Sequence, residues 1–283
     1  MQTKTLTVVR FFQGTSLTVT DSVAVEQPLN LDLIYGSLYN RNVHRLTTMM
    51  RTPGDDPSLA TGLLFSLGII KDVDDICDMS VCIRSKLQSD ATERLTVSLA
   101  PACSFSPTTY LINLPRTSSC GICSIYSPPR ADLQVDDTTD PIRVSFATLA
   151  SLPKKLSSKQ SIFQATGGVH AAAMFTAHGD LISVFEDVGR HNALDKLIGH
   201  LLRIKHQFSN SILVLSSRAS FELLEKAAMA QIPMVAVMGA VSNMAINVAH
   251  QCGITLIGFL KEDRLNVYTH GERISFGESM RVL

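Results

Sequence analysis

Two cysteines are the residues of this chain best placed to do chemistry. Cys120 and Cys123 form its only CxxC motif, within the sequence SSCGIC. A thiolate is a nucleophile, and a second thiol three positions away can receive or resolve a sulfur intermediate. Gly121 leaves the first sulfur accessible. By itself, the motif predicts either a reactive thiol pair or a structural or metal-binding role.

The positions of the other cysteines indicate how well a structural or metal-binding role fits. Cys77 and Cys82, in CDMSVC, could complete a four-cysteine zinc site, but their spacing is looser than usual and they lie in or beside a predicted strand. A thioredoxin-like redox pair normally lies near a βαβ pattern, whereas SIYSPPR follows this CxxC. Six cysteines in so long a chain do not indicate a disulfide scaffold.

A second group of polar residues lies in EDVGRHNALDKLIG. Glu186 and Asp187 end a predicted strand, Gly189 makes a turn, and Arg190 and His191 open a predicted helix. Backbone N–H groups and the positive end of a helix suit a phosphate or another anion at such a junction. The alternative is that Asp187 caps the helix and His191 is an ordinary surface residue.

A third group follows the predicted strand ILVL, in the sequence SSRASFE. Ser216, Ser217, Arg218 and Ser220 occupy the loop at the carboxyl end of this strand, which is where open α/β sheets bind ligands. The rigid fork of Arg218 suits a phosphate, although a surface salt bridge would also explain it. Ser220 could serve only as a helix N-cap.

Two glycine-containing turns, RTPGDD and QATGGVHAA, would allow a ligand to approach the backbone closely. The second contains Gly168 and His170. The chain has neither GxGxxG nor GxxxxGK[ST], which disfavours a Rossmann cofactor site and a P-loop hydrolase.

The polar groups described above must be positioned by helices and strands, and the pattern of these elements is most regular in the second half of the chain. We expect a helix at 146–156, a hairpin at 170–177 and 181–188, and a helix at 190–202. The strands ILVL, PMVAVMG and ITLIGFL then alternate with the helices FELLEKAAMAQ and SNMAINVAHQ. Such alternation predicts parallel strands with right-handed crossovers, and so an α/β fold arranged as a three-layer sandwich over 143–283.

The first half, 1–115, predicts a smaller α+β domain. RNVHRLTTMM is typical of a strand, and VCIRSKL and RLTVSLA of a hairpin. A helix is expected from Pro57 to Leu67, with Asp56 as N-cap and Gly68 just past its end. Residues 116–142, rich in Ser, Pro and Asp, predict a loop or linker that carries the CxxC.

The composition and charge of the whole chain argue against several classes of protein. Of 283 residues, 25 are Lys or Arg and 25 are Asp or Glu, so no net charge draws the chain to nucleic acid or to a membrane surface. The N-terminus lacks the apolar core of a secretory signal, which favours the cytoplasm. The uncharged stretch between Lys226 and Lys261 is broken by polar residues and does not predict a membrane span.

Six motifs, in this order, resemble the formate dehydrogenase accessory family of FdhD-type sulfur carriers: RTPGDDPSLATGLLFSLGII, SSCGIC, TGGVHAAAMF, EDVGRHNALDKLIG, SSRASFELLEKA and GFLKEDRLNVY. The resemblance implies a sulfurtransferase that accepts a persulfide sulfur from a cysteine desulfurase. It delivers that sulfur to the molybdenum of bis-molybdopterin guanine dinucleotide, before formate dehydrogenase receives the cofactor. Cys120 would carry the persulfide and Cys123 would support the transfer.

The resemblance also implies where the guanine nucleotide ends of this cofactor bind. The residues expected to contact it are Phe259, Leu260, Lys261, Glu262, Asp263, Arg264, Arg218, Ser217, Arg190, His191, Asp187 and Gly168. A cofactor with two nucleotide arms suits a symmetric homodimer, which could offer two equivalent sites.

The fold of the family resembles that of cytidine deaminases. The zinc signature of those enzymes is missing, because HNA stands in place of HxE and SSRAS in place of PCxxC. We therefore expect neither base deamination nor stoichiometric zinc. The competing hypotheses are a zinc-stabilised interaction module without enzymatic activity and a redox enzyme with a reversible disulfide.

Overall fold

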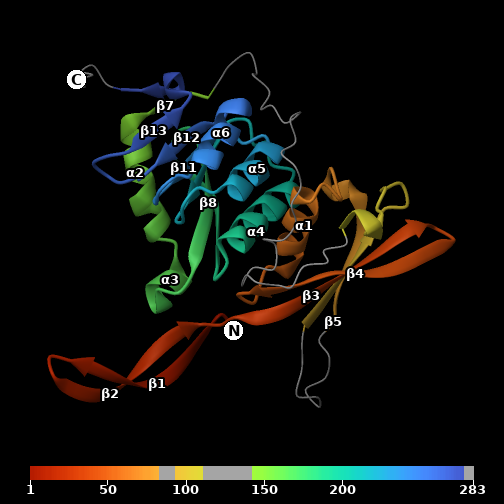
Figure 1. Ribbon diagram of the computed structural model, residues 1–283, viewed down its shortest axis with the longest axis horizontal. Helices are drawn as coiled ribbons and strands as arrows, with labels where there is room; N and C mark the ends of the chain where they lie inside the picture. The colour runs from red at the N-terminus through yellow and green to blue at the C-terminus, as the bar shows by residue number, and fades with distance from the viewer. Residues whose placement is uncertain (83–92, 111–141, 277–283) are drawn as a thin grey trace.

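The structure, a computed structural model, describes residues 1–82, 93–110 and 142–276. Its largest element is a six-stranded mixed sheet with the order β13-β12-β11-β10-β8-β9 (Figure 1). The strands are β8 (His170–Thr176), β9 (Leu181–Asp187), β10 (Ser211–Leu215), β11 (Met234–Val237), β12 (Thr255–Gly258) and β13 (Asn266–Thr269). The middle strands β10, β11 and β12 are parallel, as predicted, and β8 and β9 form the predicted antiparallel hairpin.

Helices cover both faces of this sheet. On one face lie α4 (Arg190–Arg203), α5 (Phe221–Met229) and α6 (Asn243–Gln251), and on the other lies α2 (Phe146–Ser157). Alternate residues of each strand supply the two cores, so that Leu213 and Val235 face the first helices and Ile212 and Val214 face α2. The prediction of three layers is therefore confirmed, while the likeness to cytidine deaminases stays a prediction.

A second, four-stranded sheet has the order β4-β3-β6-β5. Its strands are β3 (Gln27–Ser37), β4 (Asn40–Arg51), β5 (Ile76–Cys82) and β6 (Glu93–Leu99). The helix α1 (Asp56–Ser66) packs on it through Leu59, Leu63 and Leu64, which share a core with Leu29 and Leu31 of β3. The predicted pairing of β5 with β6 is confirmed, although β5 begins at Ile76, five residues earlier than predicted.

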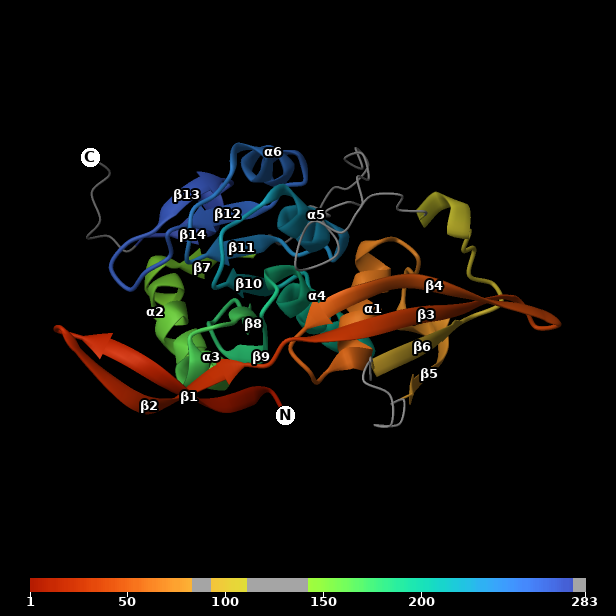
Figure 2. The ribbon, with the colours of Figure 1, turned by 60° about the horizontal axis from the view of Figure 1, so that its bottom comes forward.

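The two sheets meet where α1 packs against α4 (Figures 1 and 2). The helices cross closely because both carry a glycine at the contact. A Cβ atom added to Gly62 would lie 1.9 Å from the carbonyl oxygen of Asp195, and one added to Gly199 would lie 1.9 Å from that of Ser58. The backbones of α1 and α4 are therefore in direct contact, and no larger side chain fits at either position.

Several smaller elements were not predicted. The N-terminal strands β1 (Thr3–Phe12) and β2 (Thr15–Ala24) form a separate two-stranded ribbon that projects from the body (Figure 1). The others are α3 (Ser161–Thr166), β7 (Val144–Ser145), β14 (Ile274–Ser275) and the 3₁₀ turns η1 (Val73–Asp75), η2 (Pro107–Tyr110) and η3 (Gly271–Arg273). Because most of the ribbon's side chains are exposed, its strands lack the half-buried alternation by which strands are recognised in a sequence.

One helix boundary was predicted incorrectly. Asp55, in a left-handed conformation, holds the N-cap position of α1, and Asp56 is the first helical residue. The Asp56 carboxylate does not cap the helix because it binds the guanidinium of Arg51 instead. Gly68 lies just past the helix with a φ of 68°, as predicted. Among the described residues, no helix is long and apolar enough to cross a membrane.

The glycine contact between α1 and α4 gives a first prediction. Gly199→Ala should lower the free energy of unfolding by about 3 kcal/mol or more, because the added methyl overlaps the Ser58 carbonyl. This loss should outweigh the helix propensity of about 1 kcal/mol that alanine gains over glycine. Urea unfolding followed by circular dichroism measures it.

The matched control is Gly271→Ala, whose new Cβ would lie 3.4 Å from Val267 Cγ1, an ordinary contact. Its unfolding midpoint should stay close to that of the unmodified protein. Equal midpoints for the two variants would contradict the close packing of α1 on α4.

Candidate functional site

The predicted site loops gather at one edge of the six-stranded sheet. Strands β10, β11 and β12 are parallel, so the loops that follow them leave from the same edge. Strand β8 runs antiparallel to β10, with Ala172 opposite Leu215, and therefore begins at this edge with His170. Strand β9 returns to the edge and ends at Asp187, just before α4. We call this the carboxyl edge.

Backbone hydrogen bonds join the loops of the carboxyl edge to one another. The N–H of Gly239 donates to the Ser217 carbonyl (3.1 Å), and the N–H of Phe259 donates to the Gly239 carbonyl (2.9 Å). Gly239 permits this approach, because a Cβ there would lie 3.1 Å from both the Ser217 carbonyl oxygen and Arg218 Cγ. The loop that carries Arg218 and the segment that begins at Phe259 are thus held in register through one glycine.

A pocket of about 440 Å³ opens at this edge. Its volume falls within the range of small-molecule sites. It is lined by Val23, Ala24, Glu26, Thr166, Gly168, His170, Val188, Gly189, Arg190 and His191. Three of these residues, Gly168, Arg190 and His191, were predicted to bind the cofactor. The structure brings them together from the start of β8 and the start of α4.

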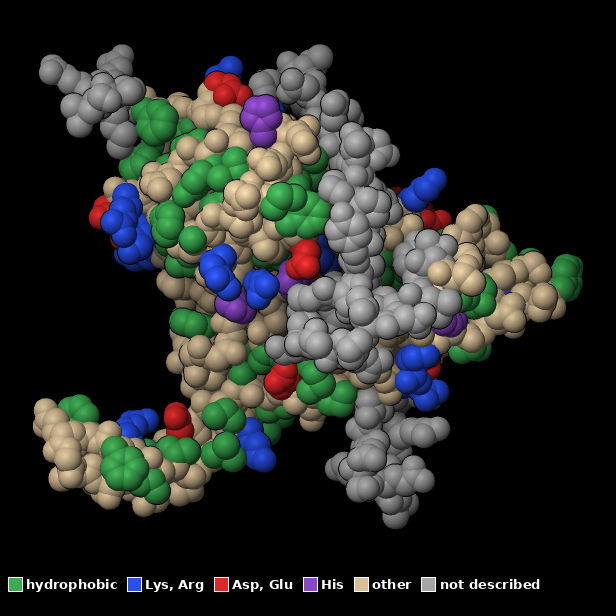
Figure 3. All heavy atoms as spheres, viewed as in Figure 1, with side chains coloured by type: hydrophobic (Ala, Val, Ile, Leu, Met, Phe, Trp, Pro, Cys, Tyr) green, Lys and Arg blue, Asp and Glu red, His purple; other side chains and the backbone are tan. Residues whose placement is uncertain are grey.

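Charged and histidine side chains gather beside the pocket. Burial, together with the charges of Arg190, Arg218 and His191, holds the pKa of His170 below its ordinary value. His191 Nε2 lies 2.7 Å from Glu222 Oε2, and this contact lowers the pKa of Glu222. Figure 3 shows basic and histidine side chains gathered where β8 and α4 lie in Figure 1, with an acidic side chain next to them. Glu222 and Glu26 are the carboxylates of this region, so Arg190 and Arg218 are the groups that suit an anion.

The start of α4 adds to this suitability. Gly189 is the N-cap of this 14-residue helix, no side chain caps it, and Gly189, Arg190 and His191 at its start line the pocket. A helix N-terminus carries a partial positive charge and offers N–H donors to a phosphate. The N-terminus of α4 and the arginines therefore both favour an anionic ligand such as a phosphate.

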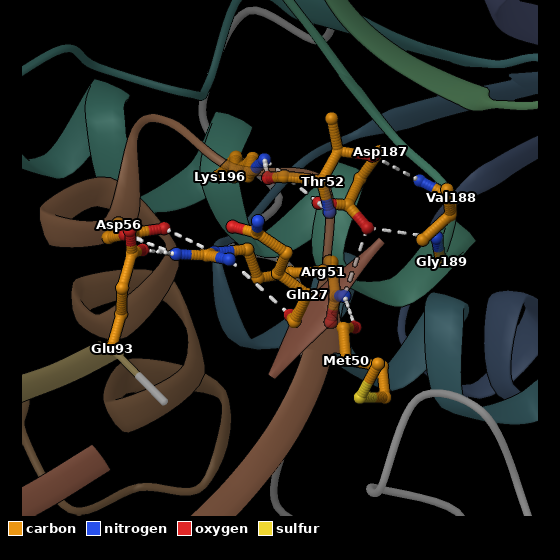
Figure 4. A network of polar contacts seen from close by, with 11 residues as sticks. Gln27, Met50, Arg51, Thr52, Asp56, Glu93, Asp187, Val188, Gly189 and Lys196 are labelled. Carbon is orange, nitrogen blue, oxygen red and sulfur yellow. Dashed lines mark hydrogen bonds and ion pairs between the residues drawn. The ribbon is translucent and has the colours of Figure 1, made fainter. Parts of the chain in front are cut away.

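Asp187 has a different role from the predicted one. It is fully buried beside the fully buried Lys196, whose Nζ lies 2.8 Å from Asp187 Oδ2. The same oxygen accepts a hydrogen bond from the N–H of Thr52 (3.0 Å), and Oδ1 accepts from Gly189 N–H (2.9 Å) and Asn192 Nδ2 (3.0 Å) (Figure 4). With both oxygens engaged inside the protein, Asp187 fixes the start of α4 and does not line the pocket.

Thr52 completes this network from the N-terminal half. Its hydroxyl accepts the N–H of Val188 (3.1 Å), and its carbonyl accepts a hydrogen bond from Lys196 Nζ (2.8 Å) (Figure 4). We call Thr52, Asp187 and Lys196, with the hydrogen bonds that join them, the buried clamp. It fastens the turn after β4 to the turn before α4.

The RTPGDD turn was expected to let a ligand approach, but its charged groups serve the fold. Arg51 is fully buried; Nε and an Nη donate to the two carboxylate oxygens of Asp56 (2.8 and 2.9 Å), and Glu93 is also paired with it. Burial alone lowers the pKa of Arg51, but the two carboxylates outweigh it and raise the pKa. Arg51 therefore joins β4, α1 and β6, and it is not available to a ligand.

The other residues of the EDVGRHN motif differ in their structural roles. The Glu186 carboxylate accepts the N–H groups of Ile162 (2.9 Å) and Phe163 (2.8 Å) and so caps α3. Asn192 donates to the carbonyl of Met50 (2.8 Å). Within this motif, the acidic residues organise neighbouring elements, and Arg190 and His191 line the pocket.

The segment from Phe259 to Arg264 follows β12 at the carboxyl edge and is not part of the lining of the pocket. Phe259 adopts a φ of 52°, and its side chain is partly exposed. Leu260 is fully buried in the core under α2, so its side chain anchors the segment and does not contact a ligand, contrary to the prediction. A turn closed by Lys261 N–H and the Arg264 carbonyl (2.9 Å) exposes four charged side chains, namely Lys261, Glu262, Asp263 and Arg264.

Ser217 is nearly buried, and its hydroxyl donates to the carbonyl of Arg218, whose own side chain is exposed. Cys120 and Cys123, with the predicted linker at 116–142 apart from Ile142, lie outside the described residues. In the ranges that are described, no three His, Cys, Asp or Glu side chains are grouped so as to hold a metal ion. The absence of zinc at the CxxC stays a prediction.

Some site residues were not among the predicted contacts. His170 was noticed only as part of a glycine-rich stretch, and Glu222 only as the last residue of SSRASFE. Val23, Ala24 and Glu26, from the base of the N-terminal ribbon, reach a pocket whose other residues lie at least 140 positions further along the chain. No local sequence signal marks them, because their role comes from tertiary contacts.

Comparisons with known proteins agree with one another. The model of the FdhD/NarQ family matches residues 26–275. The sulfur carrier protein FdhD of Streptomyces avermitilis is 39% identical over 274 residues, covering 95% of this chain and 94% of that protein. The protein of that name in Mycobacterium tuberculosis is 38% identical over 272 residues, covering 92% and 94%. That of Sulfurisphaera tokodaii is 36% identical over 275 residues, covering 97% and 100%.

A solved structure is also similar. A formate dehydrogenase accessory protein of Desulfotalea psychrophila superposes with a TM-score of 0.73, at 22% identity, covering 97% of this chain and 100% of that one. At this identity, the superposition establishes the fold.

The buried clamp gives a second prediction. Asp187→Asn should lower the free energy of unfolding by about 3–5 kcal/mol, because it leaves the Lys196 ammonium buried without its counter-charge. Adding Lys196→Met to this variant should recover part of the loss, since the uncompensated charge is then gone. Thermal and urea unfolding of the three proteins measure the effect.

Asp74 is the control, because its ion pair with Lys205 (3.1 Å) is mostly exposed and Asp74→Asn should not change stability measurably. If Asp187→Asn were as stable as Asp74→Asn, Asp187 would not hold the clamp together.

Proposed function

The chain belongs to the FdhD/NarQ family, and we propose that it is a sulfur carrier that serves formate dehydrogenase. The family match spans most of the chain, and relatives named as sulfur carrier proteins are 36–39% identical over nearly their whole length. The structural observation that carries the proposal is the carboxyl edge, where Arg190 and His170 line the pocket at the start of α4 and the exposed Arg218 lies nearby.

The proposed sulfur chemistry takes place at the CxxC. The Cys120 thiolate attacks the outer sulfur of a cysteine desulfurase persulfide, which frees the desulfurase thiolate and leaves a persulfide on Cys120. The Cys123 thiolate then attacks the inner sulfur of that persulfide. The outer sulfur leaves as sulfide, with its electrons supplied by the two cysteines, which become a disulfide. The two cysteines supply the electrons of each transfer, and a thiol reductant then reduces the disulfide and regenerates the pair.

The recipient of this sulfur is the molybdenum of bis-molybdopterin guanine dinucleotide, bound as a substrate. The pocket suits the phosphates of one nucleotide arm, because Arg190, His170 and the α4 N-terminus surround it. The exposed charges from Lys261 to Arg264 provide a second set of polar contacts. Hydrogen bonds of Gly239 to Ser217 and Phe259 join the loop that carries Arg218 to the segment that begins at Phe259, so one extended ligand along this edge would contact both.

In this proposal the buried residues of the motifs hold the binding residues in place. Asp187 fixes Gly189 and Asn192, and therefore the direction in which α4 presents Arg190. Glu222 pairs with His191 and limits the positive charge around the pocket. Arg218, which is exposed, remains able to turn toward an incoming phosphate.

The third prediction concerns the two thiols. After incubation with a cysteine desulfurase and cysteine, the protein should gain the mass of one sulfur atom in its intact mass spectrum. Cys120→Ala should abolish this gain and the activation of a dependent formate dehydrogenase, because the acceptor thiolate is missing. Cys123→Ala should still accept sulfur and yet activate poorly, since it cannot release the sulfur as sulfide.

Cys77→Ala is the control, because Cys77 is exposed on β5 and has no part in the transfer. It should behave as the unmodified protein in both assays. The sulfur-carrier proposal fails if Cys120→Ala, with an unchanged melting temperature, still activates the dehydrogenase.

The fourth prediction tests the nucleotide site separately from sulfur transfer. Guanosine diphosphate should bind the unmodified protein, and Arg218→Ala or Arg190→Ala should each weaken it about 10- to 100-fold, because each removes a charged hydrogen bond. Isothermal titration calorimetry measures the affinities. Arg203→Ala, at the opposite end of α4 from Arg190, should have no effect. Equal affinities for all of these variants would place the nucleotide elsewhere.

A further inference from the structure

The pocket at the carboxyl edge is lined by one acidic residue, Glu26, and by one arginine, Arg190. Within the described part of the chain, neither side chain forms an ion pair or a hydrogen bond, and the two are not paired with each other. A carboxylate only accepts hydrogen bonds, whereas a guanidinium only donates them. The pocket therefore offers two opposite kinds of polar group to a single ligand.

The fold fixes the position of Glu26. This residue lies in the short segment that joins β2 to β3. The N–H of Val25 donates to the Gln2 carbonyl (2.8 Å), and the Gln27 carbonyl accepts a hydrogen bond from the fully buried Arg51 (3.3 Å) (Figure 4). Glu26 itself is exposed. Its backbone is thus held on both sides, while its carboxylate is accessible to a ligand.

The base of the ribbon also gives the pocket apolar surface. Strand β2 lies beside α3, and a Cβ added to Gly168 would lie 3.5 Å from the Cβ of Ala24, an ordinary contact (Figures 1 and 2). Val23 and Val188 line the pocket as well. Apolar side chains with a few placed polar groups are typical of sites for a small planar ligand.

We propose that Glu26 determines which base the nucleotide pocket accepts, by binding the ring N–H and the adjacent exocyclic amino group of guanine. The inference rests on the nucleotide site proposed above, in which Arg190 and the start of α4 hold the phosphates. The two oxygens of one carboxylate can accept parallel hydrogen bonds from two neighbouring donors. Guanine presents such a pair of donors on its 2-amino-4-oxopyrimidine edge.

Other purines present a different edge to a carboxylate. Hypoxanthine keeps the ring N–H but lacks the amino group, so one of the two hydrogen bonds is lost. Adenine has a ring nitrogen that accepts where guanine donates, and its lone pair would face the carboxylate oxygens. Xanthine has an oxo group in place of the amino group, which is again an acceptor. An unpaired charge or acceptor of this kind disfavours the wrong ligand.

Electrostatics predicts opposite signs for the two roles that Glu26 could have. A carboxylate that lines the pocket without contacting the base would only repel the phosphates, so its removal should strengthen the binding of every nucleoside diphosphate. A carboxylate that binds the base contributes two charged hydrogen bonds, so its removal should weaken the binding of guanosine diphosphate. The direction of the change therefore distinguishes the two roles.

Isothermal titration calorimetry on the full-length protein tests the proposal. The unmodified protein should bind guanosine diphosphate about 10- to 100-fold more tightly than inosine diphosphate, and adenosine diphosphate more weakly still. Glu26→Gln should weaken guanosine diphosphate about 10- to 100-fold. The same variant should strengthen xanthosine diphosphate, because the new amide group can donate to the oxo group. A gain of affinity for one nucleotide cannot come from unfolding.

Asp21→Asn is the matched control, because Asp21 is an exposed carboxylate on the same ribbon and is not part of the pocket lining. It removes the same charge and should leave all four affinities unchanged. The pterin rings of the cofactor carry the same pair of donors as guanine. Competition against bound guanosine diphosphate by guanosine and by 6-hydroxymethylpterin therefore distinguishes the two sources: stronger displacement by guanosine supports the proposal, and stronger displacement by the pterin overturns its assignment to guanine.

The remaining outcomes separate this inference from the function on which it rests. Unchanged or tighter binding of guanosine diphosphate by Glu26→Gln would overturn the role of Glu26. If Arg190→Ala lost affinity in the same experiment, the nucleotide site itself would stand. No binding of guanosine diphosphate by the unmodified protein would instead reject the nucleotide site, and the role of Glu26 with it.

Discussion

The ion pair between Asp187 and Lys196, with Thr52 bound to both, is the interaction on which the site depends. Both charged groups are fully buried, and neither is tolerated there without the other. The pair lies where the turn after β4 meets the turn before α4 (Figure 4). The two halves of the chain are therefore held together next to the start of α4, where Arg190 and His191 line the pocket.

The position of α4 follows from this constraint and from the glycines that face each other across α1. Gly62 and Gly199 bring the two helices into backbone contact, so α4 cannot slide or rotate without a clash. Ser66 and Lys226 both bind the buried carboxylate of Asp195, which adds a second polar tie between α1, α4 and α5. Arg190 and His191 are thus presented by a firmly constrained helix, as the proposed nucleotide site requires.

The acidic and the basic residues of the predicted site have different positions in the structure. Asp187, Glu186 and Asp56 satisfy donors inside the protein, because a buried carboxylate needs several hydrogen bonds. Arg190 and Arg218 lie at the carboxyl edge, where a phosphate could complete their hydrogen bonding. The sequence marked both kinds of residue as polar groups at strand–helix junctions, and that local signal does not distinguish a clamp from a ligand contact.

The sequence by itself determined the secondary structure of 146–260 nearly element by element, because buried strands and amphipathic helices leave periodic patterns. It also located the carboxyl edge, since parallel strands must end on the same side. Only the tertiary structure decided that Leu260 faces the core, that Arg51 forms an ion pair with Asp56, and that Glu26 lines the pocket. Each of these depends on which distant segment packs alongside. That choice arises from the burial of charge and apolar surface across the whole fold, and local spacing does not contain it.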